Sequence, residues 1–318
     1  MARHNVLITS ASGNIGKELV PLLLSSNLDL KLVLPTTNAQ KLLSSVPAAA
    51  SNQDVAVEEG NVQDPVWVQS LLHTHSIDTV FLNLAGVDEL FTTCNFFASM
   101  VQSGSVKHLV YLSGCGDYLS TTGVKKLMQA CTAGHCLVKS LIEQKIVYGD
   151  LPFTSTILGP TLFFTNDLRS KQAMLEASVF GEPLANVSRV HPADIALAVQ
   201  NCILDQGRRW NLQKIMIGSK HCYTGGETAA LWSRALQRDI VMTDDMGAFE
   251  ANIAMKMGGS VDARAWGRDL RSMYEYFAVY DFAMTGEDYD LQVELLGREP
   301  ADYEQWVART GSEWIAIG

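Results

Sequence analysis

Apolar and polar positions follow two different periods along the first half of the chain. Short apolar runs bounded by turn residues predict buried strands, and the stretches between them carry apolar residues at helical spacing. This alternation is typical of a parallel sheet that is covered by helices on both faces. We expect six strands, the number that a doubly wound nucleotide-binding sheet requires, at 5–9, 30–34, 55–58, 79–84, 106–112 and 153–158, with helices at 15–24, 40–46, 65–72, 89–102 and 135–148.

The second half of the chain is less regular and mainly helical. The pattern predicts strands at 187–190, 209–212 and 215–217, and helices at 193–204, 227–236, 249–257 and 263–282, with short helices before Trp306 and Trp314. The expected fold is therefore α/β: a Rossmann-type doubly wound parallel sheet with a smaller, mainly helical C-terminal substrate lobe. The dinucleotide-binding core is expected at residues 1–160, with 187–217 returning to it, and the substrate-binding lobe at 161–186 and 218–318.

Composition narrows the range of partners. Hydrophobic residues make up 47% of the chain and charged residues 18%, which is typical of a globular protein rather than of a disordered one. The formal net charge of -10 and the lack of a basic run argue against a nucleic-acid partner, because such binding needs clustered lysine and arginine. We expect a small-molecule substrate, and a monomer or a homodimer.

The chain is expected to be cytoplasmic, with no membrane partner. It opens directly into an apolar strand without a signal-peptide pattern, and apolar runs such as 19–24 are too short to span a bilayer, which takes about 20 residues. The cysteines form no CxxC pair and are interpreted as reduced thiols. The spacing of His135 with Cys131 and Cys136 fits no common zinc signature, so no metal site is expected.

The strongest local signal is the turn Ser10–Gly16, between the first expected strand and the first expected helix. Glycines in such a turn allow backbone N–H groups to approach a pyrophosphate, which then lies at the positive end of the helix. Gly13 and Gly16 match the second and third glycines of the dinucleotide fingerprint, and Ser10 stands at the first. A tight turn without a ligand is the alternative. The residues expected to hold the pyrophosphate are Ser10, Ser12, Gly13, Asn14, Ile15 and Gly16.

Other strand ends complete the expected cofactor site. Small residues at the carboxyl ends of strands leave room for a nucleotide, although they are also ordinary turn residues. The second strand ends without the acid or the arginine that usually contacts the adenosine ribose, and only Lys41 could reach a phosphate there, so the choice between NAD and NADP stays open. The expected contacts are Asn61 and Val62 at the end of the third strand, and Leu84, Ala85 and Gly86 at the end of the fourth.

His135 and Lys139 lie four residues apart on one expected helix and therefore share a face. A lysine can hold the nicotinamide ribose and lower the pKa of a neighbour, and a histidine can donate a proton near neutral pH. A solvated lysine and a packed histidine are the alternative. Ser113, at the end of the fifth strand, and Tyr118 are further candidate proton donors, and Ser113 can equally be a turn residue.

Six segments spread over nearly the whole chain, given at the end of this paragraph, together resemble the NmrA-like group of atypical short-chain dehydrogenases/reductases. The resemblance implies a Rossmann domain for NAD(P) and a smaller C-terminal substrate lobe. It places Lys139 at the family's characteristic lysine, His135 where the usual Tyr-x-x-x-Lys pair has its tyrosine, and Pro160 among the residues beside the cofactor. The matching segments are Asn5–Gly16, Val110–Ser113, His135–Glu143, Thr156–Asn166, Val190–Ala196, and Leu295–Pro300 followed by Trp306.

The residues and the resemblance predict an NAD(P)H-dependent oxidoreductase that uses NADP or NAD. Its expected substrate is a small, largely apolar carbonyl or enone, such as an intermediate of secondary metabolism. Gly159 and the Leu34–Pro35 pair replace two arginines that are common in the group. Two alternatives remain open: a non-redox isomerase, cyclase or dehydratase on the same scaffold, and a dinucleotide-sensing regulator without catalysis.

Overall fold

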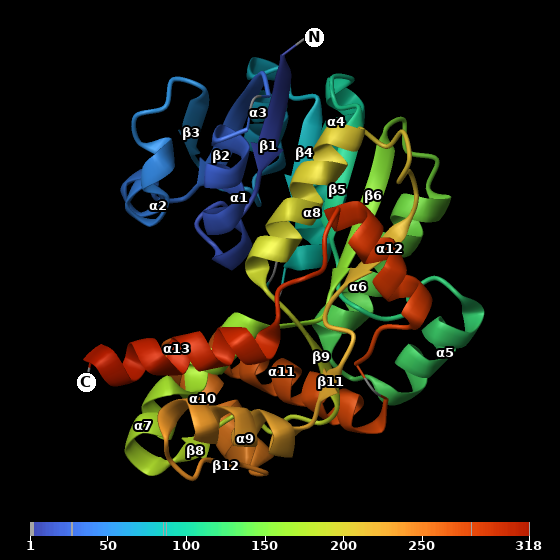
Figure 1. The fold of residues 1–318 in the computed structure, drawn as a ribbon. Coiled ribbons are helices and arrows are strands. Elements are labelled where there is room, and N and C mark those ends of the chain that lie inside the picture. Colours follow the sequence, from blue (N-terminus) through green and yellow to red (C-terminus); the bar gives the residue numbers. More distant parts are fainter. Residues whose placement is uncertain (1–2, 27, 85, 87, 281, 318) are drawn as a thin grey trace. The chain divides into compact units, whose positions relative to one another are not determined.

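The computed structural model describes residues 3–26, 28–84, 86, 88–280 and 282–317 (Figure 1). Contacts within the chain divide it into two compact units. The first unit consists of residues 1–114, 138–159 and 192–215, and the second consists of residues 115–137, 160–191 and 216–318.

These boundaries differ from those that the sequence suggested. Residues 115–137 were expected in the dinucleotide-binding core, but the structure groups them with the second unit. The helix α5 (Thr121–Ala130), which the apolar pattern did not reveal, lies in this segment. Its residue Leu127 and the following Cys131 belong to a buried cluster against which Met273 and Tyr276 pack. Packing within the second unit therefore accounts for the difference.

Parallel strands form the centre of the first unit, as predicted. β1 pairs with β2 on one side and with β4 on the other, β3 follows β2, and β5 and β6 follow β4, all in parallel. The order 3-2-1-4-5-6 confirms a doubly wound dinucleotide-binding sheet, and β10 adds a seventh strand beside β6. The strands are β1 (His4–Ile8), β2 (Leu30–Thr36), β3 (Val55–Glu59), β4 (Thr79–Leu82), β5 (His108–Leu112), β6 (Thr154–Pro160) and β10 (Lys214–Ile217).

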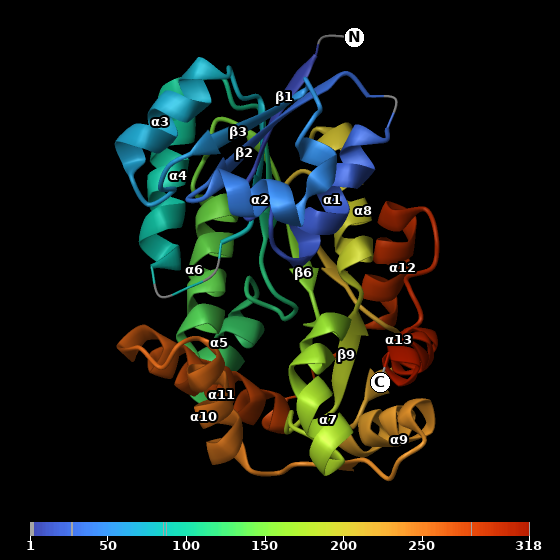
Figure 2. The ribbon, with the colours of Figure 1, turned by 90° about the vertical axis from the view of Figure 1, so that its left-hand side faces the viewer.

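Helices cover both faces of this sheet, which also agrees with the prediction. α1 packs with α8 on one face, and α3 packs with α4 on the other (Figure 2). Leu82, Phe96 and Ile142 are almost completely buried in the core beneath α3, α4 and α6. The helices are α1 (Asn14–Leu24), α2 (Ala39–Ser45), the 3-10 turn η1 (Pro47–Ala49), α3 (Pro65–Thr74), α4 (Glu89–Ser103), α6 (Gly134–Tyr148) and α8 (Pro192–Asp205).

The strand predicted at 209–212 is wrong, because this segment forms turns. The carboxylate of Asp205, at the end of α8, accepts hydrogen bonds from the backbone N–H groups of Arg209 and Trp210 at 2.9 and 3.1 Å. A side chain that satisfies backbone donors in this way competes with strand pairing. The strand predicted at 215–217 is present as part of β10.

The second unit is mainly helical, as predicted, and its sheets are small. One sheet has the order β11-β9-β7, and the other consists of β12 and β8. The two short helices predicted near the end of the chain form a single helix, α13. The remaining elements are β7 (Leu162–Phe163), η2 (Phe164–Ser170), α7 (Lys171–Ala177), β8 (Val179–Phe180), β9 (Val187–Val190), β11 (Cys222–Tyr223), α9 (Gly225–Leu236), β12 (Val241–Met242), α10 (Met246–Lys256), α11 (Val261–Val279), α12 (Gly286–Leu296) and α13 (Tyr303–Ile317).

A buried carboxylate joins several elements of the second unit. Asp167 on η2 accepts hydrogen bonds from Arg189 on β9 and from the hydroxyl of Tyr303 on α13. The indole N–H of Trp232 on α9 donates to the same carboxylate at 2.9 Å. All four side chains are buried, so the charge of Arg189 is neutralised inside the core. Among the helices that the structure describes, none has the length and apolar character needed to cross a membrane.

Candidate functional site

The turn between β1 and α1 presents backbone atoms at the start of the helix. Gly13 precedes α1 with φ near -77°, and no described side chain caps the helix there. The N–H of Gly13 donates to the carbonyl of Ser10 at 2.9 Å, which closes the turn. A Cβ on Gly13 would lie only 3.1 Å from the same carbonyl oxygen. The helix start therefore lacks both an acidic side chain and a covering side chain, which suits a bound anion.

Ser10 adopts the left-handed conformation, with φ of 54°. This conformation favours glycine, the residue that the fingerprint has at this position. Here the serine hydroxyl donates to the carbonyl of Asn83 at 2.8 Å, and the hydroxyl of Thr9 accepts the N–H of Asn83, also at 2.8 Å. These bonds fasten the end of β1 to the end of β4, where the strand order reverses.

Gly16 is required by close packing. A Cβ at this position would lie 2.3 Å from the carbonyl oxygen of Ala11, so only glycine allows α1 to approach the turn. Ile15 is buried, Ser12 is half-buried, and Asn14 is exposed. The predicted segment thus presents its backbone at the start of α1, as a pyrophosphate site requires, and its residues fit that group. Their contacts with a cofactor stay predictions.

Among the described residues, the other predicted cofactor residues lie at or shortly after the ends of strands. The side-chain oxygen of Asn61 accepts the N–H of Gln63 at 3.0 Å, so this asparagine shapes the loop after β3. Val62 packs against the apolar core of the first unit. Gly86 has φ of 129°, which favours glycine. Ala85 lies outside the described residues. Pro160, at the end of β6, belongs to the second unit, where its carbonyl accepts the N–H of Cys115 at 2.9 Å.

Lys139 is buried, and its ammonium has three protein acceptors. It donates to Glu89 Oε1 at 2.5 Å, to the carbonyl of Leu112 at 2.9 Å and to the carbonyl of Leu84 at 3.4 Å. An ammonium group has three hydrogens, so these contacts use all of them. Glu89 is the first residue of α4, where the helix dipole favours a negative charge. Lys139 therefore connects α6 to α4 and to the ends of β4 and β5.

Tyr111 completes this group of side chains. Its hydroxyl donates to Glu89 Oε1 at 3.3 Å, and the Lys139 ammonium lies 5.1 Å from the centre of its ring. Burial raises the pKa of Tyr111 well above 10, and the nearby carboxylates of Glu89 and Glu143 raise it further. Tyr111 therefore keeps its proton at neutral pH and acts as a hydrogen-bond donor to Glu89.

Ser113 follows β5 and contacts a second buried carboxyl group. Its hydroxyl donates to Glu143 Oε1, which also accepts a hydrogen bond from Lys214 Nζ at 2.7 Å. Glu143 is fully buried, and its Oε2 has no hydrogen-bond partner among the described residues. Burial raises the pKa of Glu143, and the contacts with Lys214 and Ser113 offset this only in part. The site thus combines a hydroxyl group with a carboxyl group that retains its proton to higher pH than usual.

His135 and Tyr118 belong to the second unit. His135 Nδ1 pairs with a carboxylate oxygen of Asp269 on α11, and its Nε2 lies 3.3 Å from the sulfur of Met273 and 3.5 Å from that of Cys136. Both ring nitrogens thus have neighbours, as in the alternative of a packed histidine. Tyr118 is buried, and its ring closely approaches the backbone of Gly116.

Sequence reasoning did not single out Glu89, Glu143 or Lys214. One signal was available, because Glu143 follows Lys139 by four residues on α6 and so lies on the same side of the helix. Glu89 and Lys214 are 50 and 71 residues from their partners along the chain. No local pattern reveals such distant pairs.

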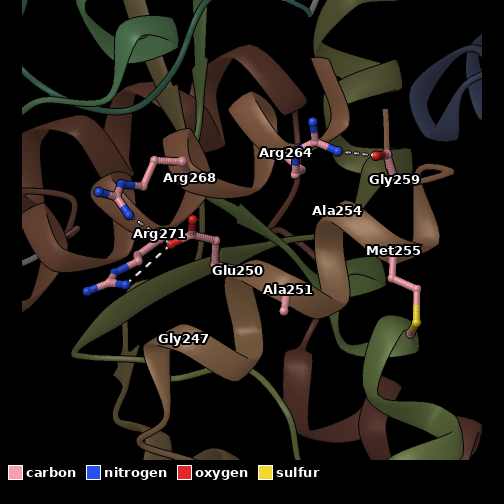
Figure 3. A pocket seen from close by; sticks show the side chains of 9 residues that line it. All are labelled: Gly247, Glu250, Ala251, Ala254, Met255, Gly259, Arg264, Arg268 and Arg271. Atoms are coloured by element: carbon pink, nitrogen blue, oxygen red, sulfur yellow. Dashed lines mark hydrogen bonds and ion pairs between the residues drawn. The ribbon is translucent and has the colours of Figure 1, made fainter. Parts of the chain in front are cut away.

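A separate groove of about 640 Å³ lies between α10 and α11 of the second unit (Figure 3). Arg268 and Arg271 both reach the carboxylate of Glu250, at 3.5 and 3.3 Å, while Arg264 donates to the carbonyl of Gly259 at 2.6 Å. None of the predicted site residues lines this groove. It is therefore distinct from the candidate site.

Comparisons with known proteins agree with this fold. A family model described as NAD(P)H-binding matches residues 10–206, which is more than half of the chain. No curated protein matches the sequence.

Solved structures with the same fold have several activities. A nucleoside-diphosphate-sugar epimerase from Staphylococcus aureus has a TM-score of 0.75 and 15% identity, over 96% of this chain and 99% of the epimerase. An NADPH-dependent quinone oxidoreductase from Escherichia coli, complexed with NADPH, has a TM-score of 0.72 and 16% identity, over 96% and 99%. NmrA, a negative transcriptional regulator in complex with NADP, has a TM-score of 0.72 and 14% identity, over 100% and 98%. These likenesses confirm the predicted NmrA-like fold, and at such identities they show the fold alone.

The raised pKa of Glu143 predicts a pH-dependent stability. In the unfolded chain this carboxyl loses its proton near pH 4.5, whereas in the folded protein it keeps the proton to higher pH. The resulting stabilisation is complete below pH 4.5 and is lost as the pH rises through the raised pKa. The free energy of unfolding of the wild type minus that of Glu143→Gln should therefore fall as the pH rises from 4.5 through the raised pKa of Glu143.

Urea denaturation of both proteins at a series of pH values measures this difference in the free energy of unfolding. Groups that titrate in the same way in both proteins contribute equally to the two free energies and so cancel. A difference that stays constant or increases with pH would show that the folded protein does not favour the protonated carboxyl.

Proposed function

The chain belongs to the NAD(P)H-binding family, and we propose that it is an NAD(P)H-dependent oxidoreductase that reduces a small, largely apolar carbonyl or enone. The observation that carries this proposal is the hydrogen bond between Ser113 and the buried Glu143, at the sheet edge where the Ser10–Gly16 turn also lies. Reduction of a carbonyl needs a hydride and a proton. The site combines a cradle for the hydride-carrying cofactor with a buried source of protons.

The first unit would hold the cofactor mainly through its backbone. Ser12, Ile15 and Gly16 would offer their N–H groups to the pyrophosphate at the start of α1, while the N–H of Gly13 closes the turn. Gly86 would leave room after β4, because a Cβ at this position would meet no described atom within 4 Å. When bound, the reduced nicotinamide supplies the hydride. Lys139 would fix the ends of β4 and β5, and the hydrogen that points to Leu84 at 3.4 Å, the longest of its contacts, is the one that a ribose hydroxyl could receive.

Ser113 and Glu143 would supply the proton. In this step the Ser113 hydroxyl, which donates to Glu143 Oε1 in the structure, would turn its hydrogen to the substrate oxygen and transfer it there. The Glu143 carboxyl would then pass its own hydrogen to Ser113 Oγ. The carboxylate that remains is stabilised by the Lys214 ammonium, 2.7 Å away. The raised pKa of Glu143 supports this order of events, because burial favours the protonated carboxyl that the step needs.

His135 and Tyr118 are the other candidate donors. The contacts of His135 with Asp269, Met273 and Cys136 favour a packing role for its ring. Ser113 is preferred as the donor because its hydroxyl contacts the buried carboxyl group of Glu143. The same Ser113–Glu143 pair could move protons without any hydride transfer, which keeps a non-redox isomerase or dehydratase as the second candidate.

The first test concerns the cradle. Gly13→Val should abolish the binding of NADH and NADPH, since added side-chain carbons would cover the helix start, while φ near -77° lets valine adopt the native backbone. Isothermal titration calorimetry measures binding, and circular dichroism checks the fold. Glu18→Gln, an exposed change one turn further along α1, should bind like the wild type. Wild-type binding by Gly13→Val would mean that the turn has only a structural role.

The second test separates redox from non-redox chemistry. Quinones and enones should oxidise the reduced nicotinamide, with about one cofactor consumed per product and a gain of two hydrogens in the product mass. Ser113→Ala and Glu143→Gln should each lower kcat about 100-fold, which is typical of a lost proton donor, and should leave cofactor binding nearly unchanged.

Product that forms at full rate in cofactor-stripped protein, with no change in hydrogen count, would establish the isomerase or dehydratase instead. Cofactor binding without turnover of any such substrate would favour the dinucleotide-sensing regulator.

A further inference from the structure

A carboxylate lies at the end of the sheet where the adenosine ribose of a dinucleotide binds. Glu59, the last residue of β3, is the register partner of Thr36, the last residue of β2. Its Oε2 accepts a hydrogen bond from the backbone N–H of Ala39, the first residue of α2, at 3.0 Å. In dinucleotide-binding sheets, the group that contacts the adenosine ribose usually comes from the end of β2. Here β2 supplies no charged residue at that point, but β3 does.

The start of α2 offers little to a phosphate. The side chain of Asn38 accepts the N–H of Lys41 at 2.8 Å, and the hydroxyl of Thr36 accepts the N–H of Asn38 at 3.1 Å. With the bond from Ala39 to Glu59, three backbone N–H groups of this turn already have protein acceptors. Lys41 is the single basic residue between positions 33 and 46. The single negative charge of Glu59 offsets the single positive charge of Lys41 in this region.

We propose that Glu59 makes this chain select NADH over NADPH. The inference rests on the proposed dinucleotide-dependent function and names the cofactor of that same site. The adenosine ribose of NADH presents two hydroxyl groups, and a carboxylate can accept a hydrogen bond from each of them. NADPH instead presents a 2′-phosphate, with a charge of about -1.5 to -2 near neutral pH. Placing this phosphate beside Glu59 sets two like charges against each other, which weakens binding.

The acid that would discriminate between NADH and NADPH comes here from β3, whereas it usually comes from β2. Strand pairing between β2 and β3 places Glu59 beside Thr36, the last residue of β2, where the acid of the usual arrangement stands. The bond to Ala39 holds the carboxylate there before any ligand binds. Selection would therefore depend on the charge of Glu59 and not on the hydrogen bond itself, because a neutral acceptor could keep that bond.

Titration of the whole protein with NADH and with NADPH tests the proposal. For the wild type, the Kd for NADPH should exceed that for NADH by about tenfold or more. In Glu59→Gln, this ratio should fall by about tenfold, mainly because NADPH binds more tightly. Glutamine keeps an oxygen for the N–H of Ala39 but carries no charge, so the loop should keep its structure.

Glu58→Gln is the matched control. Glu58 precedes Glu59, and adjacent side chains of a strand point to opposite faces. Its carboxylate contacts Nε2 of His75 at 2.8 Å. This variant loses the same charge from the same strand and should keep the wild-type ratio of the two Kd values.

The outcomes separate this inference from the proposed function. Equal or tighter binding of NADPH by the wild type would overturn the role of Glu59, as would an unchanged ratio in Glu59→Gln. An equal fall of the ratio in Glu58→Gln would also overturn it, because the effect would then reflect net charge alone. If neither nucleotide binds, the proposed function itself fails, and the inference falls with it.

Discussion

The buried pair of Lys139 and Glu89 is the interaction on which the candidate site depends. An ammonium inside a protein needs a partner charge and acceptors for its hydrogens, and breaking such a buried pair typically costs about 3–5 kcal/mol. Here one carboxylate and two strand-end carbonyls meet this need. The same three contacts fix the start of α4 relative to the ends of β4 and β5. The geometry around Ser113, which directly follows β5, is set in this way.

Because Lys139 pairs with Glu89, the two buried carboxyl groups of the first unit, Glu89 and Glu143, have different environments. Glu89 is bonded to Lys139 and Tyr111, so it serves as a fixed acceptor. Burial is the largest influence on the pKa of Glu143 and raises it, whereas the charge of Lys139 lowers this pKa only as the smallest of the causes. Two carboxyl groups on one sheet edge thus have different environments, and such a difference is how a protein separates a structural carboxylate from an acid.

Much of the fold follows from the sequence, because strands and helices in a doubly wound sheet have distinct apolar periods. The turn at Ser10–Gly16 was predicted correctly as a turn, and its left-handed Ser10 explains why glycine is usual there. The segment 209–212 was mispredicted because the side chain of Asp205 satisfies its backbone. The partners of Lys139 and Ser113 were missed for another reason. They depend on how distant segments pack, and no local pattern reports this.

One measurement tests most directly whether Lys139 acts through Glu89. NADH affinity and the free energy of unfolding should be compared for Lys139→Met, Glu89→Leu and the double variant. If the pair organises the strand ends, each single variant should lose about tenfold or more in affinity and should be less stable than the double variant, which leaves no unpaired buried charge. If Glu89→Leu bound NADH like the wild type while Lys139→Met did not, the site would depend on the lysine's own contact with the cofactor and not on the pair, and the account would be contradicted.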